Sequence, residues 1–177
     1  MLRLLTLDDC TERYVAWLGD PTINRYLESR WQEQTLESIR GFVETMRATA
    51  DNYLFAIVEA TTRLHIGNIK IGPVNHWHGY ADVGYFIGER GSWGKGYATD
   101  AIRGVTRLGF ERLGLARVQA GVYAGNAGSI RALEKASFRQ EGCFRKQLVS
   151  DSGRDDHLFY GMLREEFGGL APGVHPD

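Results

Sequence analysis

A glycine-rich segment between a strand pattern and a helix pattern is the feature that most constrains the fold of this chain. The segment "RGSWGKGYATDA", residues 90–101, directly follows "YADVGYFIG", residues 80–88, which reads as a strand. After it, apolar residues recur at helical spacing as far as Gly114, a typical C-terminal stop. Glycine lets another group approach the main chain, and a helix N-terminus presents free N–H groups. Strand, loop and helix in this order therefore suit an anion such as a phosphate.

The patterns before this unit predict a short strand, then helices, then two further strands. "LRLLTL" reads as a short strand, after which Asp8 or Asp9 is expected to cap a helix. A second helical piece is expected in "TINRYLES", and Thr35 opens a third helix in "TLESIRGFVETMRAT". Two β-branched-rich runs, residues 52–60 and 64–72, then predict an antiparallel hairpin.

The patterns after the unit predict a strand at 116–124, a helix at 126–136, and two strands turned at "SDSGR". The whole order predicts an α/β (α+β) domain with a central sheet. We expect a single domain over residues 1–167 and a mobile C-terminal tail over residues 168–177, where the apolar content is low.

Composition narrows the class of protein further. The formal net charge of −1 argues against a nucleic-acid partner, and no apolar run is long enough to cross a bilayer. The N-terminal residues lack the apolar core of a signal peptide. Cys10 and Cys143 are too few for a disulfide framework or a four-ligand zinc site. We therefore expect a cytoplasmic protein that carries reduced thiols and does not bind membranes.

Two familiar phosphate-binding motifs fail on spacing. The mononucleotide P-loop needs a glycine where the chain has Glu89 and a Ser or Thr where it has Gly96. The dinucleotide motif would place Gly or Ala at Thr99. The glycine segment belongs to neither class.

The run "GSWGKGYATDA", with "YADVGYFIG" before it and "NAGSIRALEKASFRQEGCFRK" after it, resembles the GNAT superfamily of acetyl-CoA-dependent N-acetyltransferases. The resemblance is strongest to the RimJ/RimL-like branch, which covers ribosomal-protein and small-molecule enzymes, and it extends over nearly the whole chain. It implies a mixed, mostly antiparallel sheet that splays at its middle strands, with helices on both faces. Acetyl-CoA is then expected to lie in the gap between the splayed strands, with its pyrophosphate on the loop amides.

The resemblance also implies which residues hold acetyl-CoA. The loop cradle comprises Gly91, Trp93, Gly94, Lys95, Gly96, Tyr97 and Ala98. The main chain of Phe86 and Ile87 is expected to bind the pantetheine arm, together with the side chains of Asn126 and Ser129 and, near the phosphates, Lys135. The wider superfamily favours Gln or Arg where this chain has Gly91, and Arg90 stands one place early. Asn126 also reads as an ordinary helix cap, and both roles can hold at once.

Acetyl transfer requires a neutral amine and a proton for the departing thiolate. Asp82 occupies the place of a glutamate that relatives direct at the acceptor, and His78 is a second candidate for the base. Ser129 is the best candidate for the thiolate donor, because the tyrosine common in the superfamily is Leu133 here. Tyr123 or a water molecule could donate this proton in place of Ser129. His76 and His78 lack a third metal ligand, so we expect no metal.

The segment "DPTINRYLESRW" is expected to lie over the acceptor, where Arg25, Tyr26 and Trp31 are candidate substrate-binding residues. The acceptor is then a small-molecule amine, such as an amino sugar, or a protein N-terminus. The alternative function is a non-catalytic acyl-CoA-binding regulatory domain, which Leu133 favours and which Asp82 and Ser129 oppose. Homodimers are common among relatives of this kind.

Overall fold

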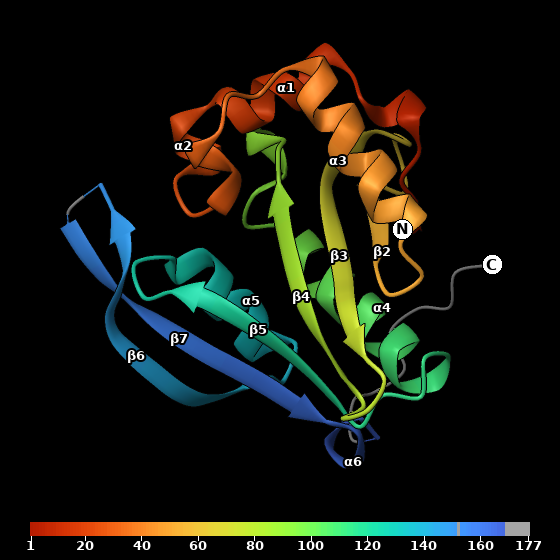
Figure 1. Cartoon of the computed structure of the whole chain (residues 1–177), viewed down its shortest axis with the longest axis vertical. Coiled ribbons are helices and arrows are strands. Elements are labelled where there is room, and N and C mark those ends of the chain that lie inside the picture. Colours follow the sequence, from red (N-terminus) through yellow and green to blue (C-terminus); the bar gives the residue numbers. More distant parts are fainter. Residues whose placement is uncertain (152, 169–177) are drawn as a thin grey trace.

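A seven-stranded sheet with the order β1-β2-β3-β4-β5-β7-β6 organises the chain. The computed structural model describes residues 1–151 and 153–168 (Figure 1). The strands are β1 (Leu2–Leu4), β2 (Tyr53–Val58), β3 (His65–Asn75), β4 (Tyr80–Ile87), β5 (Arg117–Tyr123), β6 (Arg139–Ser150) and β7 (Gly153–Leu163). All neighbours are antiparallel except β4 and β5, which run parallel.

The sheet splits at its middle. β4 and β5 pair only along Tyr80 to Asp82 and Arg117 to Gln119, and beyond this point they separate, so that the two halves form an open V (Figure 1). Their unpaired main-chain groups line the gap, where they are free to bind a ligand. The predicted mixed sheet, splayed at its middle strands, is confirmed.

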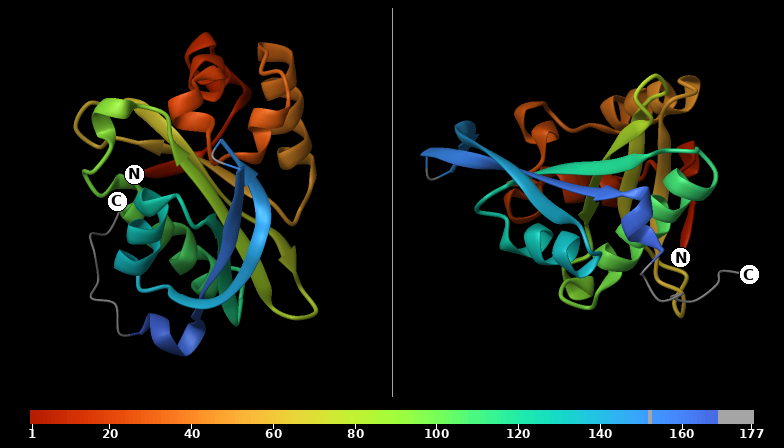
Figure 2. Two further views of the ribbon diagram at one scale, coloured as in Figure 1. Left: turned by 90° about the vertical axis from the view of Figure 1, so that its left-hand side faces the viewer. Right: turned by 90° about the horizontal axis from the view of Figure 1, so that it is seen from below.

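Helices cover both faces of the sheet, as predicted (Figure 2). One face carries the N-terminal elements η1 (Leu7–Asp9), α1 (Glu12–Gly19), α2 (Pro21–Asn24), η2 (Glu28–Trp31) and α3 (Leu36–Ala48). The other carries α4 (Tyr97–Glu111), α5 (Ala127–Lys135) and α6 (Arg164–Phe167). The short η3 (Arg90–Ser92) lies in the loop after β4 and contacts α2 through Arg90.

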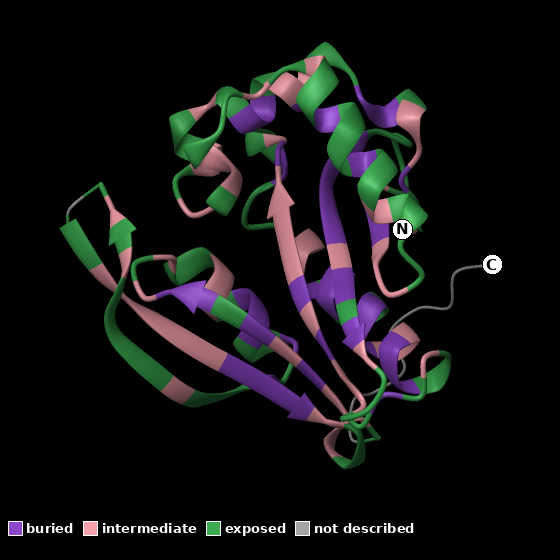
Figure 3. Cartoon of the chain, viewed as in Figure 1, coloured by how far each residue is buried: buried purple, intermediate pink, exposed green. Residues whose placement is uncertain are grey.

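Each face has its own apolar core, because successive side chains of a strand point to opposite faces. Figure 3 shows that buried residues gather along β2 and β3 of the sheet. Ile69 and Ile71 of β3 pack with Ile102 of α4, and all three are fully buried. On the opposite face Trp17 of α1 packs so closely over Gly88 that a Cβ there would lie 2.1 Å from the indole ring. Gly88 thereby fixes where the glycine loop leaves the end of β4.

Some predicted boundaries are wrong for physical reasons. Neither Asp8 nor Asp9 caps α1, which begins after Thr11; Asp9 instead accepts hydrogen bonds from the Thr6 amide at 2.9 Å and from Arg3. The helical piece in "TINRYLES" is divided into α2 and η2. The Thr35 cap of α3 is confirmed by its 3.1 Å bond from the Ser38 amide. The predicted mobile tail lies almost wholly outside the described residues, which end at residue 168.

Candidate functional site

A cavity of about 560 Å³ lies where β4 and β5 part, on the face covered by α1 to α3. Apolar side chains of α1, α3 and β2 form one wall, including Leu18, Ile39 and Leu54. The polar wall consists of residues from η2, β3, β5 and β7, namely Glu28, Asn68, Lys70, Tyr123 and His157. The cavity thus combines an apolar wall with a few placed polar groups, as small-molecule sites do.

The glycine loop stands at the N-terminus of α4. Gly94 and Gly96 adopt φ angles of +74° and +89°, and a Cβ on either residue would meet nothing within 4 Å. Gly96 is the N-cap of the 15-residue helix α4, whose first amides have no partner within the helix. Two left-handed glycines beside a helix N-terminus fit a pyrophosphate. Gly91 differs, since it lies in η3 without a positive φ.

The other side chains of the predicted cradle are placed as follows. Trp93 donates its indole N–H to the Ile87 carbonyl at 2.8 Å, and Tyr97 donates its hydroxyl to Glu59. Lys95 is exposed. The Ile87 carbonyl, predicted to bind pantetheine, therefore already accepts one hydrogen bond.

Arg90 does not replace the missing cradle side chain. Its guanidinium donates to Asp20 Oδ1 at 2.7 Å and to Thr22 Oγ1 at 2.9 Å. Asp20 also caps α2 by accepting from the Thr22 amide at 2.8 Å. Arg90 thus ties the glycine loop to α2.

The second predicted motif is assembled at α5. Asn126 caps the helix, with its Oδ1 accepting from the Ser129 amide at 3.1 Å. The Ser129 hydroxyl lies 2.5 Å from the hydroxyl of Tyr85, and both residues line the cavity. Lys135 ends the helix, exposed, and its carbonyl accepts from Arg103 at 2.5 Å.

Tyr85 is a functional candidate that sequence reasoning missed. Burial raises the pKa of its phenol to about 12, which the hydrogen bond with Ser129 opposes only in part. The phenol is therefore protonated at neutral pH and can supply a proton through Ser129. Its position two residues before Ile87 on β4, a strand already predicted to contact the co-substrate, was the signal available.

The two predicted bases lie outside the cavity lining. Asp82 is in the paired part of β4, and its Oδ1 accepts a 3.1 Å hydrogen bond from the side-chain Nε2 of Gln119. His78 lies in the turn before β4, where its ring stacks on Tyr80 with centroids 6.4 Å apart. Both roles stay predictions.

Of the three predicted acceptor residues, Tyr26 lines the cavity and donates its hydroxyl to the Gly125 carbonyl at 2.9 Å. Arg25 forms an ion pair with Asp151 at 3.6 Å. Trp31 is 60% exposed, with Arg30 over its ring. The segment thus crosses the open end of the V, but only Tyr26 of the three reaches the cavity.

Glu28 and Tyr123 form a further polar pair that was missed. The Tyr123 hydroxyl donates to Glu28 Oε1 at 2.6 Å. Burial and the adjacent Glu28 carboxylate raise the pKa of Tyr123 to about 12. Because its proton is directed at Glu28, Tyr123 is less suited than Ser129 to protonate a thiolate.

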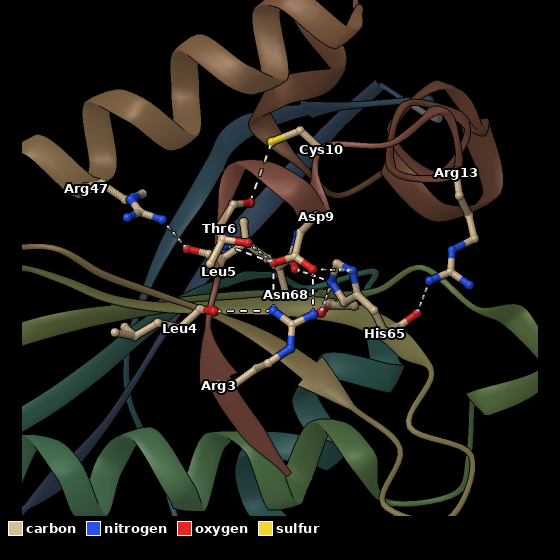
Figure 4. A network of polar contacts seen from close by, with 11 residues as sticks. Arg3, Leu4, Leu5, Thr6, Asp9, Cys10, Arg13, Arg47, His65 and Asn68 are labelled. Carbon is tan, nitrogen blue, oxygen red and sulfur yellow. Dashed lines mark hydrogen bonds and ion pairs between the residues drawn. The ribbon is translucent and has the colours of Figure 1, made fainter.

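A network of polar contacts leads from Arg3 and Asp9 to His65 and Asn68 (Figure 4). Arg3 donates to Asp9, and His65 Nε2 lies 2.7 Å from Asn68 Oδ1 and 3.0 Å from the Gly67 carbonyl. Since both neighbours of Nε2 are acceptors, the ring proton sits on Nε2. Asn68 lines the cavity and is 3% exposed, and the hydrogen bond from His65 fixes its side chain.

Sheet, glycine loop and cavity together define an acetyltransferase fold. Residues 1–139 match the family model described as "Acetyltransferase (GNAT) domain", and the chain belongs to this family. Named homologues and fold neighbours make it an N-acetyltransferase. Among the residues that the structure describes, no helix is long and apolar enough to span a membrane.

Two curated relatives from Bacillus match most of the chain. The "Uncharacterized N-acetyltransferase p20" of Bacillus licheniformis is 28% identical over 95% of this chain and 94% of its own length. The "SPbeta prophage-derived uncharacterized N-acetyltransferase YokL" of Bacillus subtilis (strain 168) is 31% identical over 84% of this chain and 82% of its own length.

A solved structure shares the fold. It is the spermidine N-acetyltransferase from Vibrio cholerae in complex with CoA and spermine, with a TM-score of 0.83. The two chains are 18% identical, and the match covers 96% of this chain and 98% of the other.

Proposed function

We propose that the protein transfers an acetyl group from acetyl-CoA directly to a primary amine, with both substrates bound at once. The observation that carries this proposal is the gap between β4 and β5. The glycine loop and α5 flank this gap, and the cavity opens into it from the acceptor face. Two substrates that enter from these sides would meet at one point, so that holding them together supplies much of the catalysis.

In this proposal the loop amides of residues 91–98 bind the pyrophosphate, with Gly94 and Gly96 giving it access. The main chain of Phe86 and Ile87 and the side chain of Asn126 bind the pantetheine arm, and Lys135 lies toward the phosphates. The CoA in the Vibrio cholerae structure supports an acyl-CoA donor. The same proposal assigns the protein to the RimJ/RimL-like branch of the family and to the cytoplasm.

Ser129 supplies the proton for the departing thiolate, and the Tyr85 phenol restores it through their 2.5 Å contact. This pair replaces the tyrosine that much of the superfamily has at the position of Leu133. Leu133 is fully buried in the core and has no group that could donate a proton. For deprotonation of the amine, Asp82 and His78 stay predictions, which the variants Asp82→Asn and His78→Gln test through turnover.

The cavity favours an acceptor with one amine and an uncharged body. Among the lining residues in the described part of the chain, Glu28 is the one carboxylate; it accepts a hydrogen bond from Tyr123, and Lys70 lines the same cavity. A polyamine would carry several positive charges into this site with little compensation. Amino sugars and protein N-termini remain the proposed acceptors, with Tyr26 in the cavity lining and Arg25 and Trp31 as further proposed contacts outside it.

The test is mass spectrometry of products after incubation with acetyl-CoA and a panel of acceptors: amino-sugar nucleotides, N-terminal peptides and spermidine. Acetylated amine and free CoA are the expected products. Stabilisation by acetyl-CoA without any product would favour the regulatory-domain alternative, and the absence of both effects would refute the proposal.

A further inference from the structure

His157 of β7 is a titratable residue in the cavity that neither the sequence motifs nor the family match assigns to catalysis. It pairs with Tyr123 of β5 in the antiparallel register, and it lines the cavity. Its ring leans back over Gly121, where a Cβ would lie 2.2 Å from Nε2. Glycine at position 121 therefore creates the space that the imidazole occupies.

The position of this ring follows from the strand register. Gly84 of β4 and Gly121 of β5 each lie two residues beyond Asp82 and Gln119, the last pair that joins these strands. The two glycines therefore flank the start of the gap, one on each side. Both line the cavity, so His157 Nε2 stands over the place where the acceptor cavity opens between the strands.

The proton of the ring is also placed. His157 Nδ1 lies 2.7 Å from Gln147 Oε1 on β6, which can only accept a hydrogen bond. Nδ1 therefore carries the proton, and the lone pair is on Nε2. Within residues 1–151 and 153–168, no group forms a hydrogen bond with Nε2. A neutral imidazole with a free Nε2 in a substrate cavity has the form that a general base requires.

We propose that His157, oriented by Gln147, is the general base that takes the proton from the acceptor ammonium. This inference rests on the proposed function and names the base that it left open. The ammonium N–H breaks and Nε2–H forms, after which the amine nitrogen bonds to the acetyl carbon and the C–S bond breaks. Ser129 protonates the thiolate and is reprotonated by Tyr85. The second amine proton returns to Tyr85, and His157 releases its proton to solvent, so that one proton is produced overall.

The charged and titratable groups around the ring agree with this role. The Glu28 carboxylate acts on it from η2, and Lys70 of β3, Tyr123 of β5 and Tyr26 line the same cavity. Burial lowers the pKa of His157 below its ordinary value of 6.5, and the Glu28 carboxylate opposes this shift in part. The base is therefore unprotonated and ready at neutral pH.

The test compares His157→Gln with wild type, using the acceptor that gives the most product in the panel. We expect kcat/KM to fall by about 100-fold and the acidic limb of its pH profile to disappear. Stabilisation by acetyl-CoA should be unchanged, which shows that the variant is folded and binds the donor. His76→Gln is the matched control, because His76 is an exposed histidine outside the cavity that contacts Asp51.

A second variant and a second acceptor separate a catalytic from a structural role. Gln147→Leu should reduce kcat by about tenfold and leave the acetyl-CoA KM unchanged, because it frees the ring without removing the base. A weakly basic amine, already neutral at pH 7, should recover most of the rate in His157→Gln. Full activity of His157→Gln with an intact acidic limb would overturn the inference, whereas an inactive wild type would refute the proposed function itself.

Discussion

At His65, burial outweighs the effect of the neighbouring charges. His65 is 8% exposed and is surrounded by Arg3, Asp9 and Arg13. Burial lowers its pKa; the Asn68 hydrogen bond and Asp9 act in the opposite direction and do not outweigh it. The folded protein therefore holds His65 neutral, with its proton directed at Asn68 behind the cavity.

This burial predicts a stability that falls in mild acid. The unfolded chain binds a proton at His65 as the pH drops through its ordinary value of 6.5, whereas the folded chain does so only at lower pH. The stabilisation is thus fully present above pH 6.5 and is lost toward the folded pKa, by at most about 1.4 kcal/mol per pH unit. Urea unfolding between pH 7.5 and 5.5 should show a smaller decline for His65→Gln. An equal decline in both proteins would contradict the expectation.

The thiolate proton gives a second residue-level prediction. Ser129→Ala removes the hydroxyl between Tyr85 and the expected sulfur position, so we expect kcat to fall by about 10- to 100-fold. Tyr85→Phe keeps the serine and should reduce kcat less, because water can replace the phenol proton. Steady-state kinetics at saturating acetyl-CoA measure both. If Tyr85→Phe is the more damaging variant, Tyr85 is the direct donor.

At this scale the sequence predicts the motif residues but not the partners that the fold supplies. Asn126 and Ser129 lie three apart in one helix, and the structure joins them as a cap. His157 and Gln147 belong to two strands of a hairpin with an irregular register between Phe144 and Leu148. Period-two alternation cannot reveal which side chains meet across such a bulge.

At the scale of elements, the glycine loop is the part that local chemistry specifies best. Periodicity and glycine placement predict the strand, the loop and the helix, and the positive φ angles of Gly94 and Gly96 agree with this prediction. The short helices were harder to predict. α2 and η2 have four residues each, and they are held by contacts to distant segments, such as Arg90 to Asp20 and Tyr26 to Gly125.

A pair of glycine variants separates binding from backbone strain in this loop. Gly96 and Gly114 flank α4 at φ values of +89° and +70°, and a Cβ would meet nothing within 4 Å at either position. Alanine at either position should cost about 1 kcal/mol of stability. Only Gly96→Ala should also raise the KM for acetyl-CoA, because Gly114 lies at the far end of the helix. Equal KM values in the two variants would argue against the cradle.

At the scale of the whole molecule, the sheet is two half-sheets joined by one short parallel ladder. The open end of the V is crossed by the segment 20–31. This segment reaches β5 through Glu28 and Tyr123, Gly125 just after β5 through Tyr26, and the tip of β6 through Arg30 and the Val149 carbonyl. The acceptor side is thus closed by contacts within the chain. In the gap, the main-chain groups of β4 that face β5 have no strand partner within the described residues and can bind a ligand. Composition and order predict the two layers, but the gap depends on the pairing of β4 with β5.

This arrangement predicts where acetyl-CoA stabilises the molecule. Saturation at about 100 times Kd adds about 2.7 kcal/mol, which raises Tm by roughly 5 to 10 °C for a domain of this size. Hydrogen exchange should slow at those amides of residues 83–87 that point away from β3, and at the amides of the glycine loop, because these groups gain partners in the gap. The hairpin of β6 and β7 serves as the internal reference, since its ladder is already paired. Protection that appears in the hairpin but not in β4 would place the donor elsewhere and remove the gap from the mechanism.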